Sequence, residues 1–395
     1  MGKPALRVAI VGGGIGGMSA GIALSQRGMD VQVFEQAPRL GEIGAGVLMT
    51  PNSLRLLERM GMGAALAEVG ATVGSGSSYY RMDGTVIAPI QTTDSSGWNG
   101  VYGMHRADLL SVLAEHLPAG VVQTNSRCTR FEQTADSARL LFDNGKAVEA
   151  DIVIAADGIH SALQQYVVEP SQPVHSGSVA YRGLIPAAML PSWPSDVSQL
   201  WMGEGKHFLV YPVRSGSLIN YVGFVPSDER AKESWSAPGD GARLASEFAG
   251  WDPRVEELLS KVEDTFWWGL YDREPLDSWT NGRLALMGDA AHPMLPHLGQ
   301  GANQAIEDGV ALAVMLAGVG PEQAPHALQM YETLRRERTN QVQAWARVNG
   351  DRYDSARAYE NLSRRDAEIA ASVDSRLWLY DYDVEERASQ LAASQ

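Results

Sequence analysis

The sequence predicts an α/β fold in which a Rossmann-like nucleotide-binding domain is interleaved with an antiparallel-sheet substrate domain and followed by C-terminal helices. The first observation is a strand, a glycine turn, a helix and a second strand within residues 7–36, as in a βαβ nucleotide-binding unit. The second is a series of strand-like runs with turn signals between residues 176 and 282, which favours an antiparallel sheet. The third is a helical pattern that begins near residue 325.

The first unit carries a glycine fingerprint between its strand and its helix. Val8 to Val11 form the continuous apolar run expected of a buried parallel strand, and the turn that follows has the form G-x-G-x-x-G. Its three glycines are Gly12, Gly14 and Gly17. Glu35 closes the second strand at about the spacing of a carboxylate that binds the ribose hydroxyls, which argues against a 2′-phosphate there. Dinucleotide binding is therefore predicted, but NAD and FAD share this cradle.

Two further segments end apolar strands in glycine and aspartate. "ADIVIAADGIHSAL" contains Asp157-Gly158, and "RLALM" leads into Gly288-Asp289 and then a Pro-His loop. A helix is evident from Gly301 onward. Small residues let a backbone approach a ligand closely, and a helix start presents unpaired N–H groups and the positive end of its dipole. The backbone of Gly299, Gly301 and Ala302 is therefore expected to face a large, flat, anionic or electron-rich ligand.

Together the three segments resemble the FAD fingerprints of the single-component flavin-dependent aromatic hydroxylases, the family of p-hydroxybenzoate hydroxylase. The similarity covers nearly the whole chain. Four stretches, "SVAYRG", "HFLVYPV", "YDREPLDSW" and "GDAAHPMLPH", most resemble 3-hydroxybenzoate 6-hydroxylase, salicylate hydroxylase and 6-hydroxynicotinate 3-monooxygenase. The resemblance implies FAD as cofactor and NADH or NADPH as transient reductant.

The resemblance also implies a reaction, namely hydroxylation of a small hydroxylated aromatic or pyridine carboxylic acid, with or without decarboxylation. In that cycle NAD(P)H reduces FAD, dioxygen forms a hydroperoxide at the flavin C4a carbon, and its distal oxygen attacks the substrate ring. The hydroperoxide must be kept from water. Two alternatives stay open: a flavin oxidase or reductase on the same scaffold without oxygen insertion, and a non-enzymatic flavoprotein that regulates a partner.

Cofactor contacts follow from the same resemblance. It implies that Asp289 holds the ribityl chain of FAD, that Arg106 contacts the flavin side, and that Asp157 occupies the position that serves both FAD and NAD(P)H. The family commonly has an arginine a few residues after the Asp-Gly pair, where this chain has Gln164. The preference between NADH and NADPH is therefore left open.

The strand "KHFLVYP" carries the expected substrate chemistry. Alternate residues of a strand share a face, so His207, Leu209 and Tyr211 should point one way, with about 13 Å between His207 and Tyr211. A phenol with a pKa of about 10 needs help to ionise at neutral pH. We expect His207 to take or relay the phenol proton and Tyr211 to orient the substrate from the opposite end of the pocket. The alternative is that His207 only caps the sheet edge.

His297 and a set of apolar residues are further candidates for the substrate pocket. His297 lies in the loop beneath the expected flavin edge, where substrate contact and a structural role are both open. The similar hydroxynicotinate enzymes carry histidine where this chain has Leu48. The predicted apolar wall consists of Leu48, Met49, Trp201 and Met202. His292 is expected to pack or to lie on the pyrophosphate side.

The predicted domains are discontinuous along the chain. The FAD-binding domain comprises residues 1–70, 100–175 and 283–335; the substrate domain comprises 71–99 and 176–282; and 336–395 form a C-terminal helical segment. The aromatic run "DSRLWLYDYDVEE" in that last segment is expected either to cover an edge or to join a dimer contact.

Composition argues against several other functions. The chain of 395 residues has 47 acidic and 32 basic side chains and a formal net charge of −15, which argues against nucleic acid and anionic membranes as partners. The single cysteine, Cys128, excludes an intrachain disulfide, and no His, Cys and carboxylate cluster has metal-ligand spacing. No signal peptide or apolar run of membrane-spanning length is evident. We expect a cytoplasmic monomer or homodimer that acts on a small aromatic substrate and dioxygen.

Overall fold

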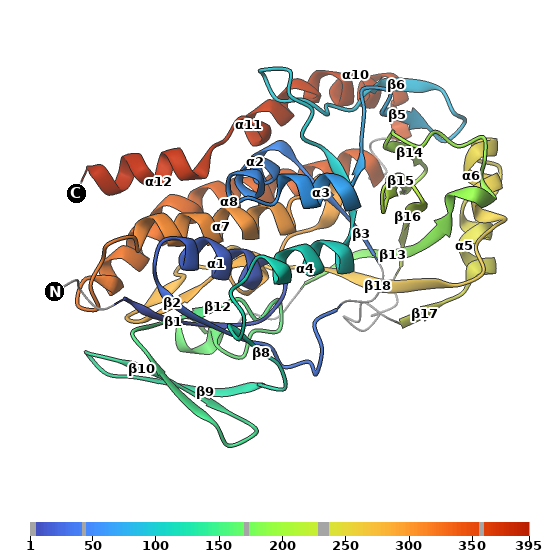
Figure 1. The fold of residues 1–395 in the computed structure, drawn as a ribbon. Coiled ribbons are helices and arrows are strands. Elements are labelled where there is room, and N and C mark those ends of the chain that lie inside the picture. The colour runs from blue at the N-terminus through green and yellow to red at the C-terminus, as the bar shows by residue number, and fades with distance from the viewer. Residues whose placement is uncertain (1–4, 42–44, 170–173, 228–236, 355–358, 395) are drawn as a thin grey trace.

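The computed structural model describes residues 5–41, 45–169, 174–227, 237–354 and 359–394. A mainly parallel six-stranded sheet lies beneath a layer of helices (Figure 1). Its strands follow the spatial order β19 (Thr280–Asn281), β20 (Leu284–Leu286), β12 (Ile152–Ala155), β1 (Arg7–Val11), β2 (Asp30–Phe34) and β8 (Val122–Gln123). Val8 pairs with Ile152 on one side and with Val31 on the other. Segments far apart in the sequence therefore share one sheet.

The carboxyl ends of three neighbouring parallel strands meet at one edge of this sheet. β1 ends at Val11, β12 at Ala155 and β20 at Leu286. Open parallel sheets bind ligands outside this edge. The glycine fingerprint and the two later turns follow these strand ends directly, so the strand order brings all three turns together.

Close helix packing covers the sheet. α1 (Ile15–Gln26) packs on α7 (Gly301–Met315), where a Cβ added to Gly309 would lie 2.8 Å from the Cα of Ala20. The absence of a side chain at Gly309 permits this approach. The same layer contains α2 (Pro51–Arg59), α3 (Gly63–Val69), α4 (Arg106–Glu115), α8 (Ala324–Asp354) and α12 (Val384–Ala393) (Figure 1). A small sheet of β9 (Cys128–Gln133), β10 (Ala138–Phe142) and β11 (Ala147–Ala150) lies on the opposite side.

An eight-stranded sheet stands beside the first one (Figure 1). Its spatial order is β17 (Ala237–Gly239), β18 (Thr265–Asp272), β13 (Val174–Pro186), β16 (Leu218–Pro226), β15 (Lys206–Val213), β14 (Gln199–Gly203), β5 (Ser78–Arg81) and β6 (Val86–Pro89). Only β14 and β5 pair in parallel; the other neighbours are antiparallel. α5 (Gly241–Glu247) and α6 (Pro253–Leu259) cover one face around an aromatic core that contains Phe208.

The predicted alternation along β15 is confirmed. Phe208 and Val210 are buried in the core under α5 and α6. His207 and Leu209 point to the other face, where they line a cavity. The turn at residues 214–217 joins β15 to β16, with left-handed backbone at Arg214, Ser215 and Gly216.

A short three-stranded sheet connects the two large ones. It consists of β3 (Gly46–Met49), β7 (Tyr102–His105) and β4 (Ala71–Thr72). A Cβ at Gly103 would lie 1.9 Å from the carbonyl oxygen of Pro212, so β7 passes directly against the end of β15. The short sheet therefore packs directly against the eight-stranded sheet.

The C-terminal segment covers the side of the molecule that carries this cavity. It contains α10 (Leu362–Ser372), the 3₁₀ turn η5 (Asp374–Arg376) and α11 (Leu377–Tyr380), and then α12, which packs on α7. Leu379 and Tyr380 are buried in one cluster with Trp268 and Leu298. Of the two roles considered for the aromatic run, the structure supports covering. The residue boundaries of the domains stay a prediction.

The described structure also contains the single cysteine, Cys128, and the side chains and helices relevant to metal binding and to membrane spanning. Cys128 is buried and burial raises the pKa of its thiol to about 11, so it is a packed residue rather than a nucleophile. Within the described ranges, no group of three or more His, Cys, Asp or Glu side chains is placed to hold a metal ion. None of the described helices combines the length and the apolar character needed to span a membrane.

Candidate active site

The glycine fingerprint forms a tight cradle at the end of β1. Gly12 has a φ of +111°, and a Cβ there would lie 2.2 Å from the carbonyl oxygen of Ala156. A Cβ at Gly17 would lie 2.0 Å from the carbonyl oxygen of Gly12. A Cβ at Gly14, by contrast, would meet no atom of the described residues within 4 Å, and Gly14, the N-cap residue of α1, has no side chain that could cap the helix. The N-terminus of α1 is therefore open to an anionic group.

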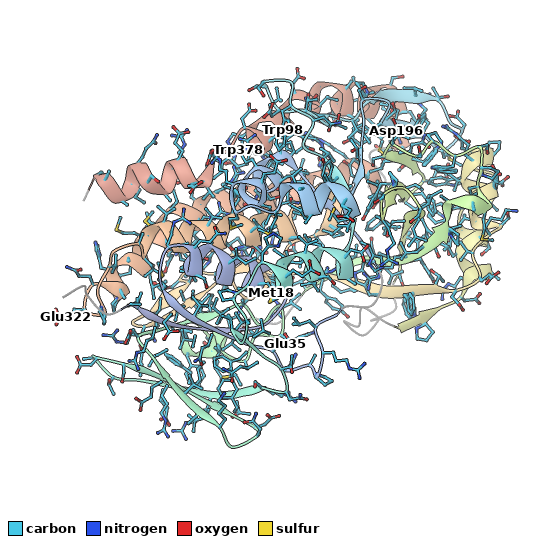
Figure 2. The ribbon with its side chains drawn as sticks, viewed as in Figure 1. Met18, Glu35, Trp98, Asp196, Glu322 and Trp378 are labelled. Atoms are coloured by element: carbon cyan, nitrogen blue, oxygen red, sulfur yellow. The ribbon has the colours of Figure 1, made fainter. Side chains whose placement is uncertain are left out.

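Glu35 is held at the mouth of this cradle. Its Oε2 accepts a hydrogen bond from the backbone N–H of Gly13 at 2.8 Å, and its Oε1 accepts one from Ala37 at 2.7 Å. Figure 2 shows Glu35 beside the strand edge, below the helix that carries Met18. The carboxylate is thus fixed at the point where a ribose would follow the pyrophosphate.

Asp157 and Gln164 tie the second turn to the third. Asp157 Oδ2 accepts the N–H of Ala162 at 2.8 Å, while its buried Oδ1 has no hydrogen-bond partner among the described residues. Burial raises the pKa of Asp157. Gln164 Nε2 donates to the carbonyl oxygen of Ala290 at 2.9 Å. The glutamine that replaces the usual arginine is therefore a buried link between two turns.

The third turn and the start of α7 present backbone rather than side chains. Gly288 and Gly299 have φ values of +57° and +65°, in the left-handed region that favours glycine. Asp289 is exposed between buried neighbours. The N-cap residue of α7, Gln300, makes no side-chain capping hydrogen bond to the described residues, so the N–H groups at Gly301 and Ala302 lie at an uncapped helix start.

Asn303 fixes the position of this helix start, a role that no motif in the sequence indicates. Its Nδ2 donates to the carbonyl oxygens of Gly299 at 2.7 Å and Leu48 at 2.9 Å. Its Oδ1 accepts the N–H of Thr50 at 3.0 Å. One buried amide therefore joins the glycine loop to the end of β3.

A fully buried ion network lies behind the same helix start. Arg335 donates to Glu307 at 2.6 Å and to Asp308 at 2.8 Å, and Arg338 donates to Glu307 at 2.8 Å. His292 Nε2 donates to Asp308 at 2.5 Å, so the expected packing role of His292 holds. Burial by itself would raise the pKa of Asp308, but His292 and Arg335 outweigh it and hold the pKa at about 2. This network anchors α7 to α8.

A cavity lies between the eight-stranded sheet and the C-terminal segment. It reaches the glycine loop, because Leu48, Thr50 and Gly299 are part of its lining. Its apolar wall is largely different from the predicted one. Leu48 contributes, but Trp201 faces the opposite side of β14, where its Nε1 donates to Asp252 at 2.8 Å. Met49 and Met202 are buried outside the lining; the wall instead includes Leu200, Leu209, Phe224 and Leu298.

His207 is held by two contacts at the wall of this cavity. Its Nδ1 lies 2.7 and 2.9 Å from the carboxylate oxygens of Asp354, and its ring stacks on Phe224 at 4.0 Å between centroids. A carboxylate accepts, so Nδ1 carries the hydrogen and the Nε2 lone pair remains for a ligand. Asp354, the last residue of α8, is 147 residues away in the chain, and no motif or spacing in the sequence indicates this pairing.

His297 faces His207 across the cavity wall. The ring centroids are 5.3 Å apart, and the backbone of Gly350 packs against the His297 ring, since a Cβ there would lie 2.8 Å from Cδ2. Burial, assisted by His207, lowers the pKa of His297 to about 3, so its imidazole is neutral at ordinary pH. Its buried Nδ1 finds no hydrogen-bond partner within the described part of the chain.

Tyr211 does not share this cavity with His207. The structure puts it outside the lining residues, so the prediction that both residues line opposite ends of one pocket is wrong. A Cβ at Gly46 would lie 2.7 Å from the Tyr211 hydroxyl, and Gly103 covers the ring. Burial raises the pKa of Tyr211, and the nearby positive charges of Arg182 and Arg106 oppose that rise. The two residues share a face of β15, but β7 covers the Tyr211 end.

Similarity to known proteins agrees with this geometry. The profile of a family described as "FAD binding domain" matches residues 5–346. A 3-amino-4-hydroxybenzoate 2-monooxygenase of Streptomyces platensis is 37% identical over 384 residues, which cover 95% of this chain and 96% of that protein. A salicylate hydroxylase of Pseudomonas putida is 36% identical, with 98% of this chain and 95% of that protein covered.

This chain belongs to the FAD-dependent aromatic hydroxylases. A solved structure of a salicylate hydroxylase with substrate superposes on it with a TM-score of 0.86 at 28% identity, covering 98% of each chain. The predicted resemblance, fold class and enzyme class are confirmed. The matched family is described by its FAD-binding domain, so FAD is the cofactor, and NAD(P)H is the reductant typical of these hydroxylases.

The cradle of the hydroxylase fits the shape and charge of FAD. Open space at Gly14 faces the uncapped start of α1, which suits a pyrophosphate, and Glu35 lies one step further out for a ribose. The uncapped start of α7 suits the electron-rich edge of the flavin ring. Leu48 and Gly299, which line the cavity described above, lie next to this start of α7.

Proposed function

We propose that this hydroxylase inserts one oxygen atom of dioxygen into a small hydroxylated aromatic or pyridine carboxylic acid, with NADH or NADPH as reductant. The observation that carries the proposal is the pair of His207 and Asp354, at 2.7 Å, in a cavity that opens onto the glycine loop of the FAD site. Relatives named for salicylate, 3-amino-4-hydroxybenzoate and 6-hydroxynicotinate all act on acids of this kind.

The FAD contacts of the proposal come from all three turns. They are Gly12, Gly14, Gly17, Glu35, Arg106, Asp157, Gly288, Asp289, Gly299, Gly301 and Ala302. Bound and reduced FAD supplies the activation of dioxygen that the amino acids cannot supply. The uncapped N-terminus of α7 stabilises negative charge next to Gly301 and thereby favours the reduced cofactor.

His207 acts as the general base in this proposal. Its free Nε2 takes the proton of the ring hydroxyl, which makes the ring electron-rich and ready for attack by an electrophilic oxygen. Asp354 keeps Nδ1 protonated and stabilises the imidazolium that forms, as an orienting carboxylate does for other histidine bases. The reaction requires the tautomer of His207 with hydrogen on Nδ1. Asp354 holds that tautomer and acts through His207, so it is a positioning residue.

His297 and the apolar wall complete the pocket. Because His297 is neutral, its Nδ1, which has no partner among the described residues, can donate or accept a hydrogen bond with the substrate without adding charge to the pocket. Leu200, Leu209 and Phe224 exclude water from the reacting ring. Tyr211, which lies on the Arg106 side, is proposed to orient the complex indirectly, through the packing of β3.

The alternative, an oxidase or reductase without oxygen insertion, is not favoured, since the relatives are named as monooxygenases and hydroxylases. The exact ring, decarboxylation, a cytoplasmic location and a monomeric or homodimeric state stay predictions.

The test is turnover under ¹⁸O-labelled dioxygen. The FAD-loaded protein is given NADH or NADPH with salicylate, 3-amino-4-hydroxybenzoate or 6-hydroxynicotinate, and both product label and hydrogen peroxide are measured. We expect at least one acid to stimulate NAD(P)H oxidation and to gain one labelled oxygen. Stimulated oxidation that yields only peroxide, with unlabelled substrate recovered, would refute oxygen insertion and favour the oxidase.

A further inference from the structure

One cation in the cavity wall has no role in the function proposed so far. Arg376, at the end of η5, lines the same cavity as His207 and is half-buried. Its Nη2 donates to the Tyr79 hydroxyl at 2.9 Å. Across the described ranges, no carboxylate oxygen lies within 4.0 Å of a guanidinium nitrogen of Arg376. Its charge is therefore met by phenols.

Those phenols cannot neutralise the charge. Burial raises the pKa of Tyr353 well above its ordinary value and raises that of Tyr380 as well, so both hydroxyls stay protonated. Both residues line the cavity together with Tyr79. Nearby arginines differ: Arg365 pairs with Asp366 at 2.8 Å, and Arg335 has two carboxylates. An unpaired cation in a partly apolar wall is unfavourable until an anion arrives.

Arg376 lies on the same wall as His207, separated from it by aromatic rings. The His207 and Tyr353 centroids are 5.2 Å apart, the Tyr353 and Tyr79 centroids 6.3 Å apart, and Tyr79 holds Arg376. A second cavity between α8 and α10 reaches Arg376, Tyr79 and Tyr353 from outside. The guanidinium therefore lines the same cavity as His207 and as Gly299 of the glycine loop.

We propose that Arg376 binds the carboxylate of the substrate and so directs the ring hydroxyl toward His207. The proposal rests on the proposed function for the identity of the ligand as a hydroxylated ring acid. A planar guanidinium matches a carboxylate in charge and geometry. The charged ends of a hydroxy acid then have separate partners, Arg376 for the carboxylate and His207 for the phenol proton.

The test compares each acid with its neutral amide. Dissociation constants for salicylate, 3-amino-4-hydroxybenzoate and 6-hydroxynicotinate, and for their carboxamides, are measured from the change in flavin fluorescence of the FAD-loaded protein. In Arg376→Met, the affinity for the preferred acid should fall by roughly 30-fold or more, while the affinity for its amide changes little. Arg376→Lys should recover part of the difference, because it restores the charge without the planar fork.

Three controls separate charge from packing. Tyr79→Phe removes the hydrogen bond to Arg376 and should leave the preference for acid over amide in place. Arg352→Met changes a cation that lines only the second cavity and should have no effect. FAD content and the melting temperature of each variant show whether the fold is intact.

The outcomes distinguish this inference from the proposed function. Equal weakening of acid and amide in Arg376→Met, or no weakening, overturns the anion site, as does a parent protein that prefers none of the acids to its amide. If acid binding depends on Arg376 but no labelled oxygen enters any acid, the anion site stands and the proposed function fails.

Discussion

Buried charged and polar groups are paired differently in two regions of this hydroxylase, the contact between α7 and α8 and the cavity that His207 lines. Behind α7, Glu307, Asp308, Arg335 and Arg338 are almost completely buried and every charge has a partner of opposite sign. In the cavity, His297 Nδ1 has no hydrogen-bond partner among the described residues, and the described partner of Arg376 is the hydroxyl of Tyr79. In the first region the protein itself supplies every partner, and the ion pairs stabilise the packing of α7 on α8. The second leaves polar groups unsatisfied, which is the condition of a site that awaits a ligand.

The largest expected effect comes from breaking the balanced side. Arg335→Met removes a cation from between Glu307 and Asp308 and leaves buried negative charge uncompensated, so the free energy of unfolding should fall by about 3–5 kcal/mol. Urea unfolding measures the change. Arg336→Met, the neighbouring residue with a partly exposed partner, Glu332, should lose less than about 1 kcal/mol. Equal losses in the two variants would show that the network does not stabilise α7.

On the substrate side, the largest effect is predicted for the base itself. His207→Gln should lower kcat for hydroxylation by about 10²–10⁴-fold, because the phenol must then ionise unaided. The rate should recover as pH rises toward the pKa of the free phenol, about 10. The pH dependence of labelled product formation measures this recovery. Tyr211→Phe, a matched change on the same strand face, should be much milder. A His207→Gln defect that is the same at every pH would contradict the base role.

Asp354 offers a sharper version of the same comparison. Asp354→Asn keeps the shape but cannot stabilise an imidazolium, so kcat should fall by roughly 10–100-fold with little change in KM. Stopped-flow absorbance of the bound phenol should show slower ionisation at neutral pH. The double variant with His207→Gln should be no slower than His207→Gln alone, because Asp354 acts through His207. Additive losses would assign Asp354 a separate role.

A smaller effect is expected at the cradle. In Gly14→Ala, the new Cβ enters open space at an ordinary backbone angle, so the protein without FAD should be as stable as the parent. The same methyl group occupies room meant for the pyrophosphate, and the FAD dissociation constant should rise by about tenfold, or ~1.4 kcal/mol. Gly320→Ala, which also has nothing within 4 Å, is the matched control. Unchanged FAD binding in Gly14→Ala would place the cofactor elsewhere.

The last prediction concerns the pH dependence of stability. The pKa of His297 is about 3 in the folded protein, below the ordinary histidine value of about 6.5, so the unfolded chain binds the extra proton first. The parent should therefore lose stability relative to His297→Leu as pH falls from about 6.5 toward 3. Unfolding by urea at several pH values measures the difference. His326→Leu, at an exposed position, should show no such trend. A constant difference at all pH values would mean that His297 is not buried as a neutral ring.

The sequence by itself determined the features that depend on neighbouring residues. A turn that needs left-handed backbone or an absent Cβ selects glycine locally, so Gly12, Gly158 and Gly288 each mark one of the three turns. The alternation that turns His207 away from the core is equally local, because successive strand residues point to opposite faces. Tertiary structure alone decided which polar groups meet. His207 contacts Asp354 across 147 residues, and Arg376, in η5 near the end of the chain, lines the same cavity as His207. Such pairings depend on packing between distant elements, and no spacing along the chain encodes them.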